Sequence, residues 1–453
     1  MAERKAFSSN LGFVLAAAAS AIGLGTLWRF PPLAAEYGGG IFLLTYLILA
    51  FTLGFVLLIT EIAIGRKTGK SALLAYGELS KKWHFLGVLA VIIACILVSY
   101  YMVIGGWVME YGTLYITNNA AAVLSPGFFQ GFISDPFLPV IWTVIFSAVT
   151  AVVLLFGVTK GIQRVSIVIL PLLIILMAIL AVYCITLPGG LDGFLYYIIP
   201  DVSKFSLEMV LQALGQTFFS LSIAMGIMVT YGSYLSKKES VEKSVLQMEC
   251  WTAGAAILAG LLIVPAVFIF TGGDMSAIQS GSALLFTQMP QVFETMGSGT
   301  VVGAVFFICV FFAALTSAIS LFEVPVSALI DRFNLSRAKA VAIVFAGTSV
   351  LALIVNFGYS IWSGFTIGNM HILEMLDTLS NSILMPLLAL LTCIFIGWVI
   401  KGRCNVVSEE VERSSPFKTK KFYVIMIKFV APVCLAAILC FMFIQTMVSI
   451  MMV

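Results

Sequence analysis

Two stretches of this chain place polar and flexible residues in the middle of apolar runs. The first, residues 19–32, contains Gly23, Gly25 and Arg29 and ends in two prolines. Glycine costs about 1 kcal/mol in a helix interior and proline about 3 kcal/mol, and an arginine inside a membrane span costs more unless it faces protein or water. A segment with so many unfavourable residues is predicted to bind a ligand.

The second stretch, residues 216–226, combines an amide, three hydroxyl groups and a glycine within another apolar run. A helix broken inside a membrane leaves backbone N–H and C=O groups without helical partners, so the break must line a protected cavity. Paired broken helices at equivalent positions of two structural repeats are typical of secondary transporters. The two stretches are therefore predicted to face the same binding site.

A third polar cluster, Thr316 and Ser317, lies in the apolar run 311–320. Hydroxyl and carbonyl oxygens are the hard, neutral ligands that a small alkali cation prefers, by extension from the rules for calcium and magnesium. The alternative is that each hydroxyl donates to a carbonyl one turn earlier in its own helix. Tyr101 is likewise open to two interpretations, as a binding residue or as an aromatic side chain that fills the bundle core.

Several charged residues lie in or near apolar runs, where an ionisable side chain is a functional-site hypothesis by default. The acids are Glu61, Glu323 and Asp377. Arg29 is predicted to pair with Asp377 on one side of the membrane, and Arg4 with Asp331 on the other. Gly161 and Pro171 frame the start of another apolar run, where they favour either local unwinding or a simple kink.

No constellation of residues indicates an enzyme. The chain has only two histidines, and it contains neither a G-x-S-x-G nor an H-E-x-x-H motif. Residues 65–71 resemble a phosphate-binding loop, but the glycine spacing is one residue too short, and the segment follows an apolar run instead of a strand. A basic connection between membrane spans explains it better.

The elements that must position these residues are membrane helices. The 453 residues are 61% hydrophobic and 10% charged, with a mean hydropathy of +1.11, whereas soluble proteins are roughly 25% charged. Because a spanning helix needs about 20 apolar residues, the sequence predicts an all-α polytopic membrane protein with about eleven spans. They are residues 11–35, 41–65, 84–116, 139–157, 165–186, 208–235, 243–271, 298–330, 339–356, 372–400 and 422–449.

Nearly all lysines and arginines fall in alternate connections between these spans. The positive-inside rule then places the N-terminus in the cytoplasm and, after eleven spans, the C-terminus outside. The first and sixth spans begin two successive groups of five, which predicts an inverted repeat. Residues 1–200 form the first repeat with an outer loop, 201–402 the second, and 403–453 a cytoplasmic loop and the eleventh span.

Three groups of motifs resemble the sodium-coupled neurotransmitter and amino-acid symporter family, and the similarity extends from about residue 4 to about residue 400. They are Gly23-Leu24-Gly25 with Trp28-Arg29-Phe30-Pro31 and Gly38-Gly39-Gly40, then Phe219-Ser220-Leu221-Ser222, and then Ala314-Leu315-Thr316-Ser317. The resemblance implies the LeuT-like fold, in which two inverted repeats of five helices have their first helices unwound at the membrane midplane. The short termini and apolar pocket are most similar to the bacterial members that carry hydrophobic amino acids.

The resemblance implies a site for an amino acid. Its carboxylate would meet backbone N–H groups and the Tyr101 hydroxyl, and its ammonium would meet carbonyls. The implied substrate-binding residues are Ala21, Leu24, Gly25, Leu97, Tyr101, Phe219, Ser220, Ser222, Met225, Ser317, Ala318 and Leu321. Gly23 stands where monoamine carriers have an aspartate, which argues against amine substrates that lack a carboxylate.

The resemblance also implies two sodium ions. The ligands of the first would be Ala21, Thr26, Ser220 and Thr252, and those of the second Ala19, Ile22, Ala313, Thr316 and Ser317. Thr26 and Thr252 stand where family members commonly carry asparagine. Chloride dependence is open, because Tyr46, Gln216 and Ser220 match the family's chloride neighbourhood while Ala256 occupies the position of the fixed carboxylate in chloride-independent members.

The family's gates transfer residue by residue. The outer gate would be Arg29 and Asp377 above Tyr101 and Phe219, and the inner gate Arg4, Asp331 and Tyr234. Gly161 and Pro171 resemble the element that unwinds the fifth span. The implied function is sodium-coupled import of aliphatic and aromatic L-amino acids by alternating access across a bacterial inner membrane, with no nucleic acid and no obligatory protein partner. The alternative is an amino-acid-binding channel or a transport-like receptor without coupled flux.

Overall fold

The computed structural model describes residues 6–368 and 370–451, and these residues are mostly helical. In that part of the chain, nine helices are long and apolar enough to cross a membrane. A tenth span is a pair of helical segments, Asn10–Ala21 and Leu24–Glu36, that meet at an angle of 51°. The chain is therefore a multi-pass all-α membrane protein. The total of eleven spans stays a prediction, because the sixth is divided into two short helices.

The elements of the predicted spans follow in chain order. They are α1 (Asn10–Ala21), α2 (Leu24–Trp28) and α3 (Phe30–Glu36); α4 (Gly40–Leu49), η1 (Ala50–Gly54) and α5 (Phe55–Thr68); η2 (Lys81–Trp83) and α7 (Phe85–Ile116); α10 (Leu138–Leu155); η3 (Val158–Gln163) and α11 (Arg164–Thr186); α13 (Leu207–Ser220) and α14 (Ile227–Gly232); α15 (Val241–Thr271); α18 (Gly299–Phe333); α19 (Arg337–Phe357); α20 (Ile372–Asp377), η7 (Thr378–Leu384), α21 (Met385–Ile394) and η8 (Phe395–Val399); and α23 (Lys420–Ile425), η9 (Met426–Val430) and α24 (Ala431–Met451).

Short helices occupy the connections. They are α6 (Ala72–Leu79), α8 (Ala120–Val123), α9 (Phe128–Ser134), α12 (Gly190–Ile198), η4 (Val202–Lys204), η5 (Met275–Ala277), α16 (Gly281–Ala283), η6 (Leu284–Gln288), α17 (Met289–Glu294) and α22 (Asn405–Glu412).

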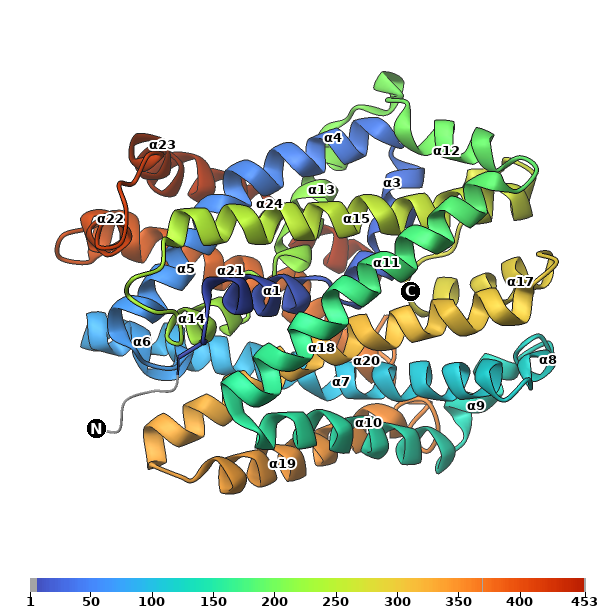
Figure 1. Ribbon diagram of the computed structural model, residues 1–453, viewed down its shortest axis with the longest axis horizontal. Coiled ribbons are helices and arrows are strands. Elements are labelled where there is room, and N and C mark those ends of the chain that lie inside the picture. The colour runs from blue at the N-terminus through green and yellow to red at the C-terminus, as the bar shows by residue number, and fades with distance from the viewer. Residues whose placement is uncertain (1–5, 369, 452–453) are drawn as a thin grey trace.

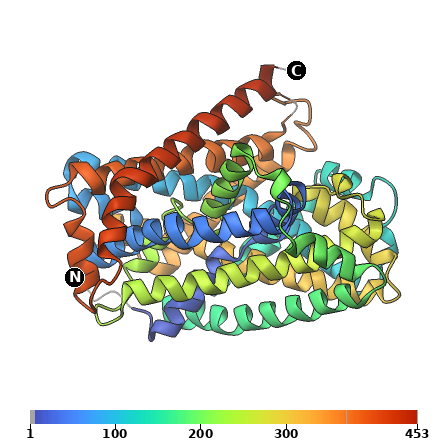
Figure 2. The ribbon, with the colours of Figure 1, turned by 90° about the horizontal axis from the view of Figure 1, so that it is seen from above.

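The long helices run roughly parallel to one another, so the molecule has two ends (Figure 1). The helices α6, α22 and α23 lie at one end, which we call the basic end because its connections carry most of the lysines and arginines. The helices α8, α12 and α17 lie at the other end, which we call the outer end. The C-terminal helix α24 leans away from the bundle at its edge (Figure 2).

Burial identifies the central helices. The most apolar windows of α18 and of the span containing α7 are 78% and 67% buried, and these two helices pack along each other. The corresponding windows of the spans ending in α24 and α11 are only 28% and 33% buried, so these helices expose most of their apolar surface at the perimeter. A membrane protein shows this pattern because lipid tails tolerate apolar side chains as well as a protein core does.

The outer connection between α15 and α18 folds back into the protein. Leu285 and Phe286 in η6 and Phe293 in α17 are buried, and the Tyr111 hydroxyl donates to the Phe286 carbonyl at 2.9 Å. The apolar composition of residues 272–297 predicts this return between the helices. The connection thereby covers the outer ends of α7 and α18.

Candidate functional site

The first span is interrupted between α1 and α2. Ile22 and Gly23 are non-helical, and Gly23 adopts an extended conformation (φ −111°, ψ −163°). The break leaves carbonyls at the end of α1 and N–H groups at the start of α2 without partners in a regular helix. Aligned peptide dipoles make the first end partly negative and the second partly positive. One interruption therefore offers ligands for both a cation and an anion.

The sixth span breaks between α13 and α14. Ser222, Ala224 and Gly226 all have positive φ angles of 53° to 74°, which are unfavourable for residues other than glycine. The carboxylate of Glu61 stabilises this turn by accepting from the Ala224 N–H at 2.7 Å. The buried acid predicted as a functional residue thus holds the break open.

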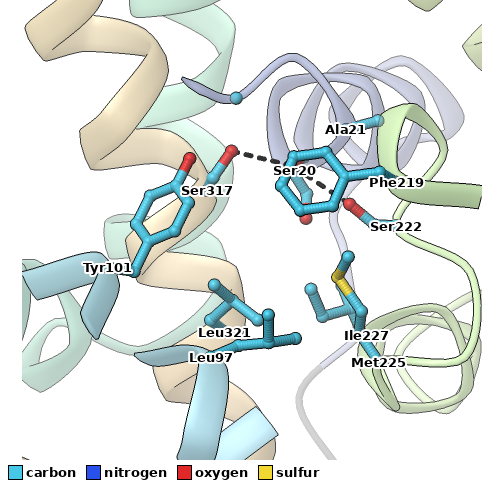
Figure 3. A pocket seen from close by; sticks show the side chains of 11 residues that line it. Ser20, Ala21, Leu97, Tyr101, Phe219, Ser222, Met225, Ile227, Ser317 and Leu321 are labelled. Carbon is cyan, nitrogen blue, oxygen red and sulfur yellow. Dashed lines mark hydrogen bonds between the residues drawn. The ribbon is translucent and has the colours of Figure 1, made fainter. Parts of the chain in front are cut away.

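The two breaks enclose a cavity together with α7 and α18 (Figure 3). Its lining consists of Ser20, Ala21, Gly23, Leu97, Tyr101, Phe219, Ser222, Met225, Ile227, Ser317 and Leu321. The cavity volume is about 20 Å³, which is enough for a single water molecule and too small for an amino acid. The protein is therefore closed around its site in this conformation.

Two hydrogen-bonding groups, the Leu24 N–H and the Tyr101 hydroxyl, meet at one side of the cavity. The Leu24 N–H donates to the Tyr101 hydroxyl at 2.9 Å, and Tyr101 is buried. A Cβ atom at Gly23 would lie 2.6 Å from that hydroxyl, and one at Gly25 would lie 1.7 Å from the Phe219 ring. Only glycine leaves this backbone accessible at both positions.

The Ser20 carbonyl connects the first span to the sixth and eighth spans. It accepts hydrogen bonds from the Ser317 hydroxyl at 2.8 Å and the Ser222 hydroxyl at 3.2 Å. Ser20, Gly23 and Ile227 line the cavity although they are absent from the predicted contacts. The position of Ser20 within the first interrupted stretch was a usable signal.

Most of the predicted substrate contacts lie at this cavity. The residues that line it are Ala21, Leu97, Tyr101, Phe219, Ser222, Met225, Ser317 and Leu321. Leu24 and Gly25 lie next to it through the contacts described above. Ser220 and Ala318 are buried nearby in α13 and α18 but do not line the cavity.

The residues predicted for the second sodium ion come from two helices that pack against each other. Ala19 and Ile22 lie at the end of α1, and Ala313, Thr316 and Ser317 lie in α18. The Thr316 hydroxyl donates to the carbonyls of Phe312 and Ala313 at 3.0 and 3.2 Å. Thr316 therefore shows the within-helix hydrogen bonding of the alternative interpretation, whereas the Ser317 hydroxyl reaches α1 by donating to the Ser20 carbonyl. A sodium site between these two helices stays a prediction.

The first predicted sodium site contains a buried oxygen in need of a partner. The Thr26 hydroxyl is buried and has no hydrogen bond among the described residues. The Thr252 hydroxyl donates to the Met248 carbonyl at 3.0 Å, and the Ser220 hydroxyl accepts from Gln216 at 2.9 Å. A cation bound by Thr26 would compensate the cost of burying an unpaired hydroxyl.

The neighbourhood predicted for chloride includes an acid. The Tyr46 hydroxyl and Gln216 Oε1 are buried without partners in the described structure, and so are both carboxylate oxygens of Glu249. Glu249 and Ala256 lie on α15, and Ala256 has no group that could carry charge. A buried acid thus accompanies the neutral donors in this region.

The outer gate residues lie close together without direct ion pairing. The Asp377 carboxylate accepts from the Tyr100 hydroxyl at 3.0 Å and from the Asn381 amide at 2.6 Å. Arg29 lines a small cavity together with Asn381 and Phe219. No ion pair between Arg29 and Asp377 is present among the described residues, so their pairing stays a prediction.

The basic end is closed by a set of contacts that includes one pair the sequence did not reveal. The Glu323 carboxylate accepts from the Tyr234 hydroxyl at 2.7 Å and from both terminal nitrogens of Arg337, at 2.6 and 3.2 Å. Asp331 accepts from the Ser71 N–H at 2.6 Å. Arg4, its predicted partner, lies outside the described residues.

The fifth span begins with a π-helix, η3, at the position predicted to unwind. Gly161 lies within η3, and Pro171 lies inside α11. The Gln163 side chain holds the N-terminal segment, because its Oε1 accepts from the Ser8 N–H at 2.9 Å and its Nε2 donates to the Ser8 hydroxyl at 2.5 Å. Single-turn π-helices are frequent at functional sites.

Comparison with known proteins gives one consistent result. The model of the sodium:neurotransmitter symporter family matches residues 4–122 and 137–452. An uncharacterized sodium-dependent transporter of Haemophilus influenzae is 32% identical, over 96% of this chain and 97% of that protein. The uncharacterized sodium-dependent transporter YhdH of Bacillus subtilis is 34% identical, over 87% of this chain and 88% of that protein.

A solved structure is similar over nearly the whole length. The crystal structure of MhsT in complex with L-phenylalanine has a TM-score of 0.85 and 33% sequence identity, and the match covers 96% of this chain and 99% of that chain. The resemblance inferred from the motifs around Gly23, Phe219 and Thr316 is therefore confirmed.

Proposed function

Because the chain belongs to the sodium:neurotransmitter symporter family, we propose that it imports hydrophobic L-amino acids together with sodium by alternating access. The family consists of sodium-coupled transporters, not enzymes. One observation carries the choice of substrate. The cavity between the broken spans has backbone N–H groups and the Tyr101 hydroxyl on one side, and Leu97, Met225 and Leu321 on another.

This distribution of groups suits a zwitterion with an apolar side chain. The start of α2 and the Tyr101 hydroxyl would hold the carboxylate, and the carbonyls near Ala21 and Ser222 would hold the ammonium. Gly23 brings no negative charge, so the substrate must supply its own carboxylate. The known complex of MhsT with L-phenylalanine supports an aromatic amino acid as substrate.

Two sodium ions are proposed as co-transported substrates. The second would bind between the end of α1 and Thr316 and Ser317 on α18, and the first would bind at Thr26 beside the substrate. A substrate carboxylate that completes the shell of the first ion would couple the two fluxes. Downhill sodium influx would then drive uptake of the amino acid.

The closed cavity represents an intermediate in the proposed cycle. Tyr101 and Phe219, beneath Arg29 and Asp377, would separate to admit substrate from the outer end. The contacts among Glu323, Arg337 and Tyr234 would then break to release it at the basic end. We place the basic end and the N-terminus in the cytoplasm of a bacterial cell and the C-terminus outside.

Uptake into proteoliposomes tests this function. An inward sodium gradient should drive accumulation of labelled leucine, phenylalanine or tryptophan above its external concentration, and replacing external chloride by gluconate measures chloride dependence. Equal uptake with potassium replacing sodium on both sides would overturn the proposal. Saturable counterflow separates the symporter from a channel, and binding without flux would identify a receptor.

A further inference from the structure

A large groove at the basic end is separate from the transport site. It has a cavity volume of about 620 Å³ and lies between three elements that are far apart in the sequence. These are η1 with the start of α5, the first turns of α15, and the segment that leads into α23. The residues that carry the argument are Phe51, Phe55, Lys243, Leu246, Lys418 and Phe422.

One part of the groove is apolar and open to the bilayer. Leu246 and Phe422 are 48% and 38% exposed, and Phe51 and Phe55 line the same cavity from the neighbouring span. All four belong to helices that are long and apolar enough to cross a membrane, and the one that carries Phe422 is only 28% buried. Exposed leucine and phenylalanine side chains at this depth would contact hydrocarbon chains instead of water.

The rim of the groove carries two exposed lysines. Within residues 6–368 and 370–451, neither Lys243 nor Lys418 forms an ion pair. Glu242 also lines the groove, but its two carboxylate oxygens accept from the backbone N–H groups of Lys418 and Thr419, at 3.1 and 3.0 Å. Two lysines and one glutamate give the lining a formal charge of +1.

Two further features favour an anion at this rim. Ser240 is the N-cap of α15, a helix of 31 residues, so the partly positive end of its dipole faces the groove. The hydroxyls of Ser240 and Ser415 lie 2.7 Å apart, and whichever of them accepts in that bond keeps its own hydrogen for another acceptor. The rim can therefore offer two ammonium groups and a hydroxyl to one phosphate.

We propose that this groove is a binding site for one anionic glycerophospholipid. Its phosphate would lie against Lys243 and Lys418, and an acyl chain would follow Phe51, Leu246 and Phe422 toward the membrane core. Basic pockets between membrane helices recognise anionic head groups by this combination of charge and apolar contact. The site requires only that the spans cross a membrane, so it is independent of the substrate that the protein transports.

Native mass spectrometry of the purified full-length chain tests the proposal. The chain is titrated with 1-palmitoyl-2-oleoyl phosphatidylglycerol and, separately, with the corresponding phosphatidylcholine. We expect phosphatidylglycerol to bind about tenfold more tightly or better, because two lysines near a membrane surface each contribute roughly fivefold. The double variant Lys243→Gln with Lys418→Gln should reduce phosphatidylglycerol affinity to that of phosphatidylcholine.

A matched control has the same change of charge at the same end of the protein. Lys81→Gln with Lys82→Gln removes two exposed lysines that do not line the groove, and this variant should bind like the unmodified chain. Leu246→Glu keeps both lysines but places a carboxylate in the acyl-chain path, and it should also weaken binding. Equal affinity for the two lipids, equal effects of the two double variants, or a bound polypeptide in place of lipid would overturn the proposal.

Discussion

Tyr101 is the side chain through which the substrate carboxylate is proposed to be recognised. Its hydroxyl is the only side-chain group that accepts from the first free N–H of α2 among the described contacts, at 2.9 Å. A carboxylate arriving at this position would compete for the same N–H and would also accept a hydrogen bond from the hydroxyl. The tyrosine links the start of α2 to α7 directly in this structure, and a bound carboxylate would replace that direct bond by lying between the two groups.

Replacing Tyr101 by phenylalanine should weaken amino-acid binding. The loss of a hydrogen bond to a charged group costs about 1–3 kcal/mol, which corresponds to an increase in Kd of about fivefold to 150-fold. Equilibrium binding of labelled leucine at saturating sodium measures the effect. Tyr183→Phe, which removes an exposed hydroxyl far from the cavity, should leave Kd unchanged. Unchanged affinity in the Tyr101 variant would mean that the carboxylate lies elsewhere.

At the scale of single residues, the sequence predicted the segments that form the site more accurately than the individual atoms that line it. Gly23 and Gly25 could be predicted because glycine is unfavourable inside a membrane helix. Thr316 could be predicted because it belongs to a cluster of hydroxyl residues in an apolar run. The contact between Glu323 and Arg337 was not found, because nothing in the sequence reveals that two residues 14 apart meet across the turn between α18 and α19. Ser20 lies in the interrupted stretch, which is a signal for the segment, but its contribution to the site is a backbone carbonyl, which every residue has.

At the scale of elements, hydropathy predicted the spans well. Most observed ends lie within three residues of the predicted ones. The fifth span is the exception, because it starts at Val158 instead of near residue 165. Lys160 and Arg164 suggested a connection at that point, but both lie within helical structure. The π-helices were not predictable, because they depend on a shift in backbone hydrogen bonding that leaves no periodic signal in composition.

The fifth span offers a sharper test at Pro171 than at Gly161. A Cβ atom at Gly161 would lie 2.2 Å from the Val153 carbonyl oxygen, so Gly161→Ala would force a backbone shift and disturb the closed conformation itself. Proline at position 171 has no N–H to donate to the carbonyl of Ile167. Pro171→Ala would restore that hydrogen bond with little steric change.

Pro171→Ala should slow transport while leaving substrate binding intact. Alanine is about 3 kcal/mol more favourable than proline inside a helix, so unwinding of the fifth span becomes more costly, and we expect kcat for uptake to fall roughly tenfold. Equilibrium Kd should change by less than about twofold. Pro188→Ala, at the outer end of the same span, is the control. An unaltered kcat would count against unwinding at this position.

At the scale of the whole molecule, the cavities beside the two predicted gates differ greatly in volume. A cavity of about 710 Å³ at the basic end is lined by Lys160, Tyr234, Ser327 and Arg337, whereas the cavity at Arg29 is about 10 Å³. The contact between Glu323 and Arg337 lies beside this basic-end cavity. Breaking that contact and unwinding η3 would extend the cavity toward the sodium site that we propose between α1 and α18.

A cysteine at position 327 reports this opening. Ser327 lines this cavity but is only 1% exposed, and its hydroxyl donates to the Val324 carbonyl at 3.0 Å, so a cysteine there should react with a membrane-impermeant thiol reagent much faster when the basic end opens. Cys250 and Cys440, which are exposed, are first replaced by serine. Sodium should slow labelling severalfold relative to potassium, because an ion that binds across α1 and α18 favours the closed arrangement.

Substrate added with sodium should then restore faster labelling, because the loaded carrier must open at the basic end to complete its cycle. Ser336→Cys, exposed at the same end, should be labelled equally in sodium and potassium and corrects for reagent access. Labelling in inside-out vesicles but not in right-side-out vesicles is expected if the basic end faces the cytoplasm. Sodium-independent labelling at position 327 would separate sodium binding from closure of the basic end, and alternating access driven by these ions would then fail.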